Sequence, residues 1–337
     1  MAARAFITGL AGAALTAEER AFLREARPWG LILFKRNIQD RAQVSGLVRE
    51  CFDAIGEVPV LVDQEGGRVQ RLGPPHWPAY PAGAAYGALY QRDKASGLRA
   101  AWLGARLIAA DLKPLGIDVD CLPLADVPVR GSDQVIGDRA YGDTPEQVAA
   151  VAAAVAEGLL DGGVLPVLKH IPGHGRANAD SHLSLPVVRA SKPELEAADF
   201  AAFRPLKGLP LGMTAHVVFT ALDPVLPVTT SATMIGEVIR GWIGFDGLLM
   251  TDDVSMGALS GSIGERSRAA LKAGCDLVLH CNGKLDEMRM VAAEAPELAG
   301  QAARRSAAAL ARRHAPKPLD LAKARREFAD LMEMRIA

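Results

Sequence analysis

The sequence comprises 337 residues, half of them hydrophobic, and its 38 basic and 39 acidic side chains give a formal net charge of −1. This balance argues against a nucleic-acid-binding surface, and no apolar stretch is long enough to span a membrane. One domain covering residues 1–337 is expected, because α/β barrels commonly reach this length without a domain boundary.

The apolar stretch near the N-terminus, residues 5–17, follows Arg4 and resembles a signal peptide in composition. Glycine and polar residues interrupt it, and Thr16 and Glu19 have the spacing of a capping box, which favours a helix beginning there over a cleavage site. The cysteines show no CxxC spacing, so buried free thiols and a reducing, intracellular setting are expected. They are Cys51, Cys121, Cys275 and Cys281.

Short β-type segments alternate with longer segments of helical periodicity. The expected strands cover residues 6–10, 31–34, 59–62, 117–122, 164–168, 212–216, 247–251 and 276–280. The expected helices cover residues 17–26, 41–55, 94–112, 145–160, 192–206 and 265–273, with terminal helices in the tail 296–337. About eight strands with helical crossovers predict an α/β fold, a single (β/α)8 barrel.

An open, doubly wound sheet is the alternative architecture. It is disfavoured because no GxGxxG sequence follows the first strand, and because polar residues cluster at several strand ends rather than at one switch point. Two long loops, residues 66–90 and 123–144, are expected to line a binding site.

Polar residues follow most of the expected strands, and a barrel gathers these strand ends around one opening. They are Asp63, Asp120, Asp126, Lys169, His170, His216, Asp252 and Asp253. Buried charges are costly unless they are paired, so the opening is expected to hold an ion-pair network or a polar ligand.

The stretch from Lys169 to His182 reads KHIPGHGRANADSH and is expected to be a polar loop, since its proline and glycines forbid a regular helix or strand. Asp180 precedes His182 by two residues, a spacing that lets the carboxylate hold the imidazole. Such a partner would raise the pKa of the histidine and make it a proton donor near neutral pH. A solvated histidine beside a capping aspartate is the alternative.

Asp252 and Asp253 directly follow the seventh expected strand. Adjacent side chains of an extended segment point in opposite directions, so one of the two carboxylates is expected to face the barrel centre and could serve as a nucleophile. The competing role, chiefly for Asp253, is capping of the next helix.

Seven segments, in this order along the chain, carry a family resemblance. They are LILFKRNI (31–38), LVDQEGGRVQRL (61–72), IGDRAYGD (136–143), KHIPGHG with DSHLSLP (169–186), MTAHVVFTALDP (213–224), GFDGLLMTDDVSM (244–256) and AGCDLVLHCN (273–282). Together they resemble glycoside hydrolase family 3, specifically its single-domain bacterial β-N-acetylglucosaminidases of cell-wall recycling.

The resemblance implies an exo-acting, retaining enzyme that removes terminal GlcNAc from peptidoglycan fragments such as GlcNAc-1,6-anhydro-MurNAc. It assigns Asp252 as the nucleophile and His182 with Asp180 as the acid and base. The sugar-binding residues that it implies are Asp63, Arg71, Arg139, Lys169 and His170. It further implies a cytoplasmic monomer that takes a small-molecule substrate, with no cofactor and no metal.

Four alternatives stay open at this point. Phosphate could replace water, because a neutral histidine repels it less than a carboxylate would. The acetamido group could be the nucleophile, with Asp252 or Asp253 only orienting it. His170, His174 and His182 could bind zinc, as in metal-dependent barrel hydrolases, although no early strand carries an HxH pair. The chain could also be a non-catalytic sugar-binding protein.

Overall fold

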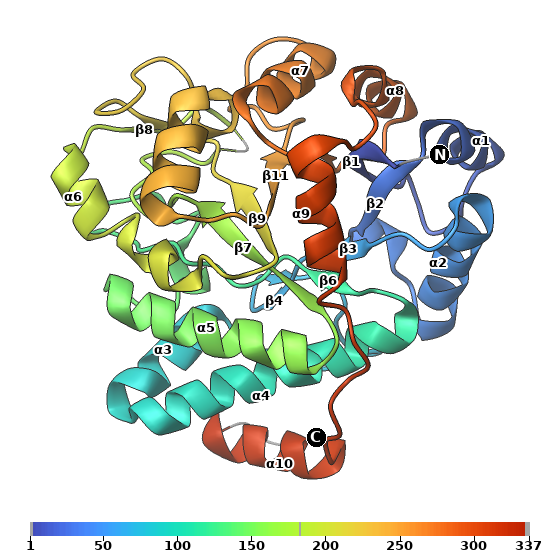
Figure 1. The fold of residues 1–337 in the computed structure, drawn as a ribbon. Helices are drawn as coiled ribbons and strands as arrows, with labels where there is room; N and C mark the ends of the chain where they lie inside the picture. Colours follow the sequence, from blue (N-terminus) through green and yellow to red (C-terminus); the bar gives the residue numbers. More distant parts are fainter. Residues whose placement is uncertain (1–2, 182, 334–337) are drawn as a thin grey trace.

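Eight parallel strands close into a barrel in this computed structural model, which describes residues 3–181 and 183–333 (Figure 1). The barrel strands are β1 (Arg4–Gly9), β2 (Pro28–Leu33), β3 (Val60–Val62), β6 (Val119–Asp120), β7 (Leu165–Ile171), β9 (Leu211–Thr214), β11 (Leu248–Asp253) and β12 (Leu277–His280). Their order around the barrel follows the chain, and β1 pairs with β12 to close it. The predicted (β/α)8 barrel is therefore confirmed, and each of the eight expected strands contributes to it.

Helices surround the barrel. They are α1 (Ala17–Ala26), α2 (Arg41–Ile55), α3 (Gly83–Arg92), α4 (Lys94–Leu112), α5 (Pro145–Asp161), α6 (Lys192–Ala197), a π-helix η6 (Met234–Ile243), α7 (Ile263–Ala273), α8 (Leu285–Glu294), α9 (Gly300–Leu310) and α10 (Leu321–Leu331). The strands β2, β7, β9 and β12 are buried along their whole length, as expected of a parallel sheet covered by helices. The predicted terminal helices are present, and α10 packs against α4.

The capping box at the start of α1 is confirmed. Thr16 Oγ1 accepts a hydrogen bond from the Glu19 N–H at 3.1 Å, and the Thr16 N–H donates to Glu19 Oε2 at 3.0 Å. The four cysteines are free and buried, as predicted. In the described part of the chain, no helix has the length and apolar character needed to cross a membrane.

Three boundaries differ from the sequence-based expectation. β7 continues to Ile171, which pairs with Thr214 of β9, so Lys169 and His170 lie within a strand and not in a loop. The expected loop 66–90 contains the start of α3, and the expected helix 192–206 divides into α6 and a 3₁₀ segment, residues 201–206. Pro205 lies in that segment, and proline cannot donate the backbone hydrogen bond that a regular α-helix needs.

Candidate active site

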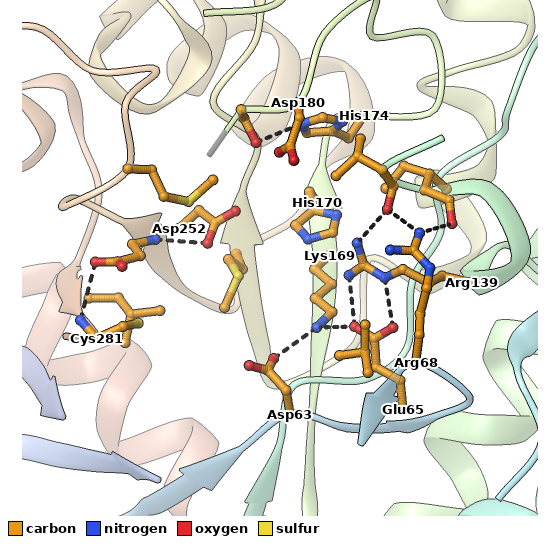
Figure 2. Close-up of a pocket in the computed structure, with 18 of the residues that line it drawn as sticks. Asp63, Glu65, Arg68, Arg139, Lys169, His170, His174, Asp180, Asp252 and Cys281 are labelled. Carbon is orange, nitrogen blue, oxygen red and sulfur yellow. Dashed lines mark hydrogen bonds and ion pairs between the residues drawn. The ribbon is translucent and has the colours of Figure 1, made fainter. Parts of the chain in front are cut away.

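A cavity of about 480 Å³ opens at the C-terminal ends of the barrel strands, within the usual size range of small-molecule sites (Figure 2). Seven of the eight residues predicted as catalytic or substrate-binding line it: Asp63, Arg71, Arg139, Lys169, His170, Asp180 and Asp252. His182, the eighth, lies outside the described residues. The fold thus brings together residues that are separated by up to 189 positions in the sequence, since the series runs from Asp63 to Asp252.

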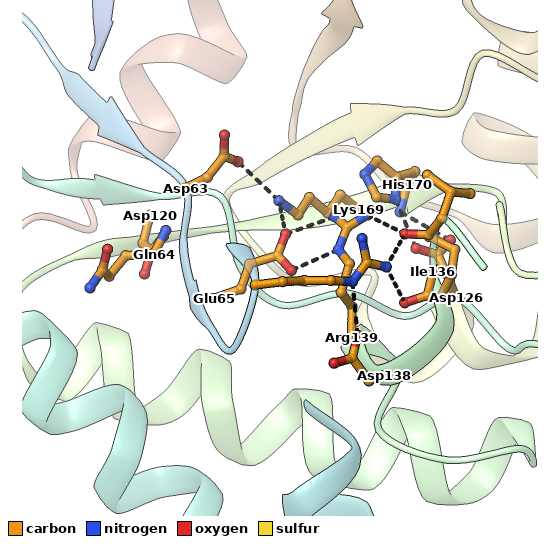
Figure 3. Close-up of polar contacts among 12 residues, drawn as sticks. Asp63, Gln64, Glu65, Asp120, Asp126, Ile136, Asp138, Arg139, Lys169 and His170 are labelled. Carbon is orange, nitrogen blue, oxygen red and sulfur yellow. Dashed lines mark hydrogen bonds and ion pairs between the residues drawn. The ribbon is translucent and has the colours of Figure 1, made fainter. Parts of the chain in front are cut away.

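Lys169 lies at the centre of an ion-pair network on the floor of the cavity (Figure 3). Its Nζ is 2.7 Å from Glu65 Oε1 and 3.1 Å from Asp63 Oδ1, and its side chain is only 2% exposed. Arg71 donates to Asp63 Oδ2 at 2.9 Å. Arg139 holds Glu65 through two parallel hydrogen bonds of 2.9 and 2.8 Å, the bidentate geometry typical of arginine and carboxylate.

This pairing fixes the charges of the network. Burial alone would raise the pKa of Asp63 and Glu65, but the neighbouring Lys169 and arginines outweigh it, so the pKa of Asp63 is well below its ordinary value and that of Glu65 falls to about 2. Burial would lower the pKa of Lys169, yet the two carboxylates raise it. All three groups are therefore ionised at neutral pH, and together they offer fixed charges to sugar hydroxyls.

Asp126 organises the start of the following loop. Its Oδ2 lies 2.7 Å from His170 Nδ1, and its Oδ1 accepts from the His174 backbone N–H at 2.7 Å. Burial would raise the pKa of Asp126, but the neighbouring His170 lowers it. Because a carboxylate can only accept, it fixes the Nδ1–H form of the His170 ring and thereby its orientation at the cavity wall.

The loop that carries Asp180 is hydrogen-bonded to its surroundings through Ser181. The Ser181 hydroxyl lies 3.0 Å from His174 Nε2, and the Ser181 carbonyl accepts from the Ala258 N–H at 3.1 Å. Burial lowers the pKa of His174 to about 4, so this ring is neutral at neutral pH. His174 is thus a hydrogen-bonded part of the loop scaffold.

Asp252 and Asp253 both line the cavity at the end of β11. The Asp253 N–H donates to Asp252 Oδ1 at 2.7 Å. Asp253 does not cap the next helix: Ser262 caps α7, while the Asp253 carboxylate accepts from Ser255 Oγ at 2.6 Å and from the Cys281 N–H at 3.1 Å. The alternative role of Asp253 as the cap of the next helix is therefore wrong, because the chain makes a turn before that helix begins.

Arg68 binds the second long loop, residues 123–144, at the edge of the cavity. Its Nε donates to Asp138 Oδ1 at 2.9 Å, and its Nη2 donates to three backbone carbonyls of residues 134–136, between 2.7 and 3.2 Å. Arg139 Nη1 also donates to the Val135 carbonyl at 3.0 Å. Residues 133–136 and 139 line the cavity, which confirms the expectation that this loop borders a site.

Sequence reasoning missed Glu65 and Arg68. For Glu65 a signal existed. The sugar-binding set implied by the resemblance held three cations, Arg71, Arg139 and Lys169, but only one carboxylate, and buried cations need matching anions. Arg68 donates mainly to backbone carbonyls of a loop, and no local sequence pattern encodes such a contact.

Zinc binding was the alternative role of the histidines. His170 and His174 pack edge to face with their ring centroids 5.7 Å apart, and they direct a nitrogen to Asp126 and to Ser181, respectively. Across residues 3–181 and 183–333, no three His, Cys, Asp or Glu side chains form a group that could hold a metal ion. His182 is outside this range.

The closed parallel barrel and its charged cavity define the class of protein, a (β/α)8-barrel enzyme with its site at the C-terminal ends of the strands. The family follows from comparison with known proteins. Residues 7–311 match the N-terminal domain of glycosyl hydrolase family 3, and the chain belongs to this family. It is therefore a glycosidase.

Relatives and solved structures agree with this assignment. The β-hexosaminidase of Alkalilimnicola ehrlichii is 43% identical over 280 residues, which cover 81% of this chain and 79% of the relative. The β-hexosaminidase of Neisseria meningitidis is 40% identical over 284 residues, covering 82% and 78%. NagZ from Neisseria gonorrhoeae, solved in complex with N-trifluoroacetyl-D-glucosamine, superposes with a TM-score of 0.89 at 32% identity, covering 98% of this chain and 99% of that chain. The same neisserial protein was also solved with a zinc ion.

Proposed function

We propose that this chain is an exo-acting, retaining β-N-acetylglucosaminidase that removes terminal GlcNAc from peptidoglycan fragments such as GlcNAc-1,6-anhydro-MurNAc, with or without peptide. The proposal rests on one observation: Asp252 lines the same cavity as the ion-pair network. This network comprises Asp63, Glu65, Arg139 and Lys169. Relatives named β-hexosaminidase and a neighbour bound to a glucosamine derivative support the choice of sugar.

The proposed mechanism has two steps. Asp252 attacks the anomeric carbon while His182, supported by Asp180, protonates the departing oxygen, which gives a glycosyl-enzyme ester. His182 then removes a proton from the water that hydrolyses this ester. Most glycosidases use a second carboxylate as the acid and base, so the imidazole of His182 distinguishes the proposed mechanism from theirs.

The sugar-binding residues fit the same scheme. Asp63, Arg71, Arg139, Lys169 and His170 are proposed to hold the hydroxyl and N-acetyl groups of the terminal sugar. Their mutual ion pairs supply charged acceptors and donors at fixed positions, so little reorganisation is needed when the sugar binds. The exo mode is supported by a cavity of about 480 Å³, which suits one terminal sugar better than a long oligosaccharide.

The whole chain is proposed to work as one barrel domain and as a monomer in the cytoplasm. Four buried free thiols favour a reducing compartment. Light scattering of the purified protein should give the mass of one chain, and cell fractionation should recover the protein with cytoplasmic markers.

The loop of residues 173–181 is proposed to move during turnover, because the acid must approach the leaving oxygen and later the attacking water. Hydrogen exchange of the corresponding peptide should slow when GlcNAc is bound. Unchanged exchange would contradict a loop motion coupled to the ligand.

An aryl β-N-acetylglucosaminide tests the function and its alternatives together. EDTA-treated protein in phosphate-free buffer should release the phenol, and should act poorly on the matching β-glucoside. A rate that requires phosphate would instead identify a phosphorylase with the same residues, and a rate that requires zinc would support a metal-dependent hydrolase. No turnover in any buffer would favour a sugar-binding protein.

A further inference from the structure

Every backbone and carboxylate polar group of Asp253 has a hydrogen-bond partner. Its N–H donates to Asp252 Oδ1 at 2.7 Å, and its carboxylate accepts from the N–H groups of Ser255 and Cys281 and from the Ser255 hydroxyl. Its carbonyl oxygen lies 3.0 Å from His216 Nε2 and also accepts from the Met256 N–H at 3.1 Å. The residue next to the proposed nucleophile is therefore held from several sides, and His216 provides the side-chain contact to its carbonyl.

His216 is fully buried, and its ring has one consistent hydrogen-bond pattern. A carbonyl can only accept, so Nε2 carries the proton that is donated to Asp253. Nδ1 then accepts from the Thr229 hydroxyl at 2.7 Å, and the Thr229 oxygen accepts in turn from the Thr214 hydroxyl at 2.8 Å. The Thr229 hydroxyl also lies 3.2 Å from the Ala215 carbonyl, a longer contact. Burial lowers the pKa of His216, which agrees with a neutral ring.

The contact lies beyond the regular pairing of β11 with β9, at a residue that is still paired with Leu279 of β12. The pairing of β9 with β11 runs from Leu211 opposite Leu248 to Met213 opposite Met250. The register of β11 against β12 shifts between Met250 and Asp253. His216 follows β9 in the chain, so its ring supplies a hydrogen bond to β11 three residues after the last regular pair with β9.

We propose that His216 is a positioning residue for Asp252. It holds the Asp253 carbonyl and thereby orients the backbone whose N–H donates to the Asp252 carboxylate, while Thr229 and Thr214 hold the ring in its Nε2–H form. This inference rests on the proposed function, because it assumes that Asp252 is the nucleophile. Displacement of a reacting group by about 1 Å can reduce a rate about 100-fold, so loss of the hydrogen bond from His216 to Asp253 can slow the attack of Asp252 measurably.

Two substitutions separate the contacts of the ring. In His216→Gln the side-chain amide nitrogen can replace Nε2 and still donate to Asp253. In His216→Asn the shorter side chain reaches only the Nδ1 position, so the donor to Asp253 is lost. Thr229→Val is the third variant: it removes the hydroxyl that selects the tautomer, and it keeps the histidine in place.

His280 offers a matched control. It is also fully buried and ends the neighbouring strand β12, but its Nε2 lies 3.2 Å from Glu287 in α8 and does not contact Asp253. His280→Asn therefore removes the same chemical group from an equivalent depth in the barrel. Melting temperatures of all variants identify any loss that arises from unfolding.

The experiment follows covalent labelling by a 2-fluoro aryl glycoside, read by intact mass, beside the Kd for GlcNAc. In His216→Asn the labelling rate should fall about 100-fold, and in His216→Gln and Thr229→Val about 10-fold or less, while the Kd for GlcNAc stays within about 3-fold. His280→Asn should label at about the wild-type rate.

Three outcomes would overturn the inference. His216→Asn could label as fast as the wild type, it could lose labelling only to the extent that His280→Asn does, or its GlcNAc affinity could fall in parallel with its labelling. Absence of labelling in the wild-type enzyme would overturn the proposed nucleophile, and with it this role of His216, so the two failures are distinguishable.

Discussion

The ammonium group of Lys169 lies 2.7 Å from the carboxylate of Glu65, and both side chains are at most 5% exposed. Glu65 also holds Arg139, so its removal leaves two buried cations with fewer partners. Glu65→Gln is therefore expected to reduce the free energy of unfolding by about 3 kcal/mol. Denaturant unfolding followed by circular dichroism measures the change.

Asp138→Asn is the control for this prediction. Asp138 pairs with Arg68, but its side chain is 54% exposed, and exposed ion pairs contribute less than about 1 kcal/mol. Equal losses in the two variants would show that burial does not determine the strength of the Glu65 contacts.

The protonation of His174 is expected to limit stability in mild acid. The ordinary pKa of 6.5 falls to about 4 in the folded protein, so between these values the unfolded chain binds more protons, and stability decreases as the pH falls. At pH 5 the expected loss from this residue is about 2 kcal/mol.

His174→Gln removes this titration and places an amide nitrogen near the Ser181 hydroxyl. Its free energy of unfolding should therefore decline less between pH 7 and pH 5 than that of the wild type, as measured by denaturant titration at both pH values. An identical decline in the two proteins would contradict a depressed pKa at His174.

Gly83 is expected to position Arg139. A Cβ atom at Gly83, the first residue of α3, would overlap the backbone carbonyl of Arg139, so Gly83→Ala must displace one of the two segments. KM for the aryl glycoside should rise about 10-fold or more, because a displaced Arg139 no longer holds the Glu65 carboxylate in its position in the cavity. Steady-state kinetics test this expectation.

Gly46 in α2 provides the matched control. A Cβ atom there has no heavy atom within 4 Å, so Gly46→Ala should leave KM unchanged and stabilise the protein by about 0.5–1 kcal/mol through its higher helix propensity. A similar KM for both alanine variants would show that the Gly83 contact does not influence the cavity.

His182 is proposed as the acid, and its contribution should depend on the leaving group. His182→Ala is expected to lower kcat/KM by about 100-fold or more for a nitrophenyl glycoside, and far less for a dinitrophenyl glycoside, whose phenolate departs without protonation. A loss of equal size for both substrates would argue against a role in proton donation.

The sequence was sufficient to predict the barrel because hydrophobic strands and amphipathic helices alternate so regularly. All eight strands and the cap at Thr16 were predicted from local patterns. The predicted end of β7 was wrong because Lys169 and His170 are polar, and a polar pair normally marks the end of a buried strand. Here the ion pairs with Asp63 and Glu65 and the contact with Asp126 allow both residues to remain inside the sheet.

The site was predicted in part. Residues such as Asp63 and Asp252 were found because they follow strands, and all strands of a barrel end at the same opening. The contacts of Asp253 with Cys281 and His216 were not predictable, since these two residues follow other strands, β12 and β9, and no local spacing encodes the contacts. Sequence patterns identify which residues reach the opening, whereas three-dimensional packing determines how they are connected.

The most direct test of the proposed mechanism is to identify the residue labelled by a 2-fluoro aryl glycoside. After labelling, the protein is digested with pepsin at low pH, where the ester survives, and the peptides are analysed by tandem mass spectrometry. The account predicts one added sugar on Asp252 and none after Asp252→Asn. A label on Asp253, or turnover of the GlcNAc substrate by an enzyme that never forms an adduct, would contradict it.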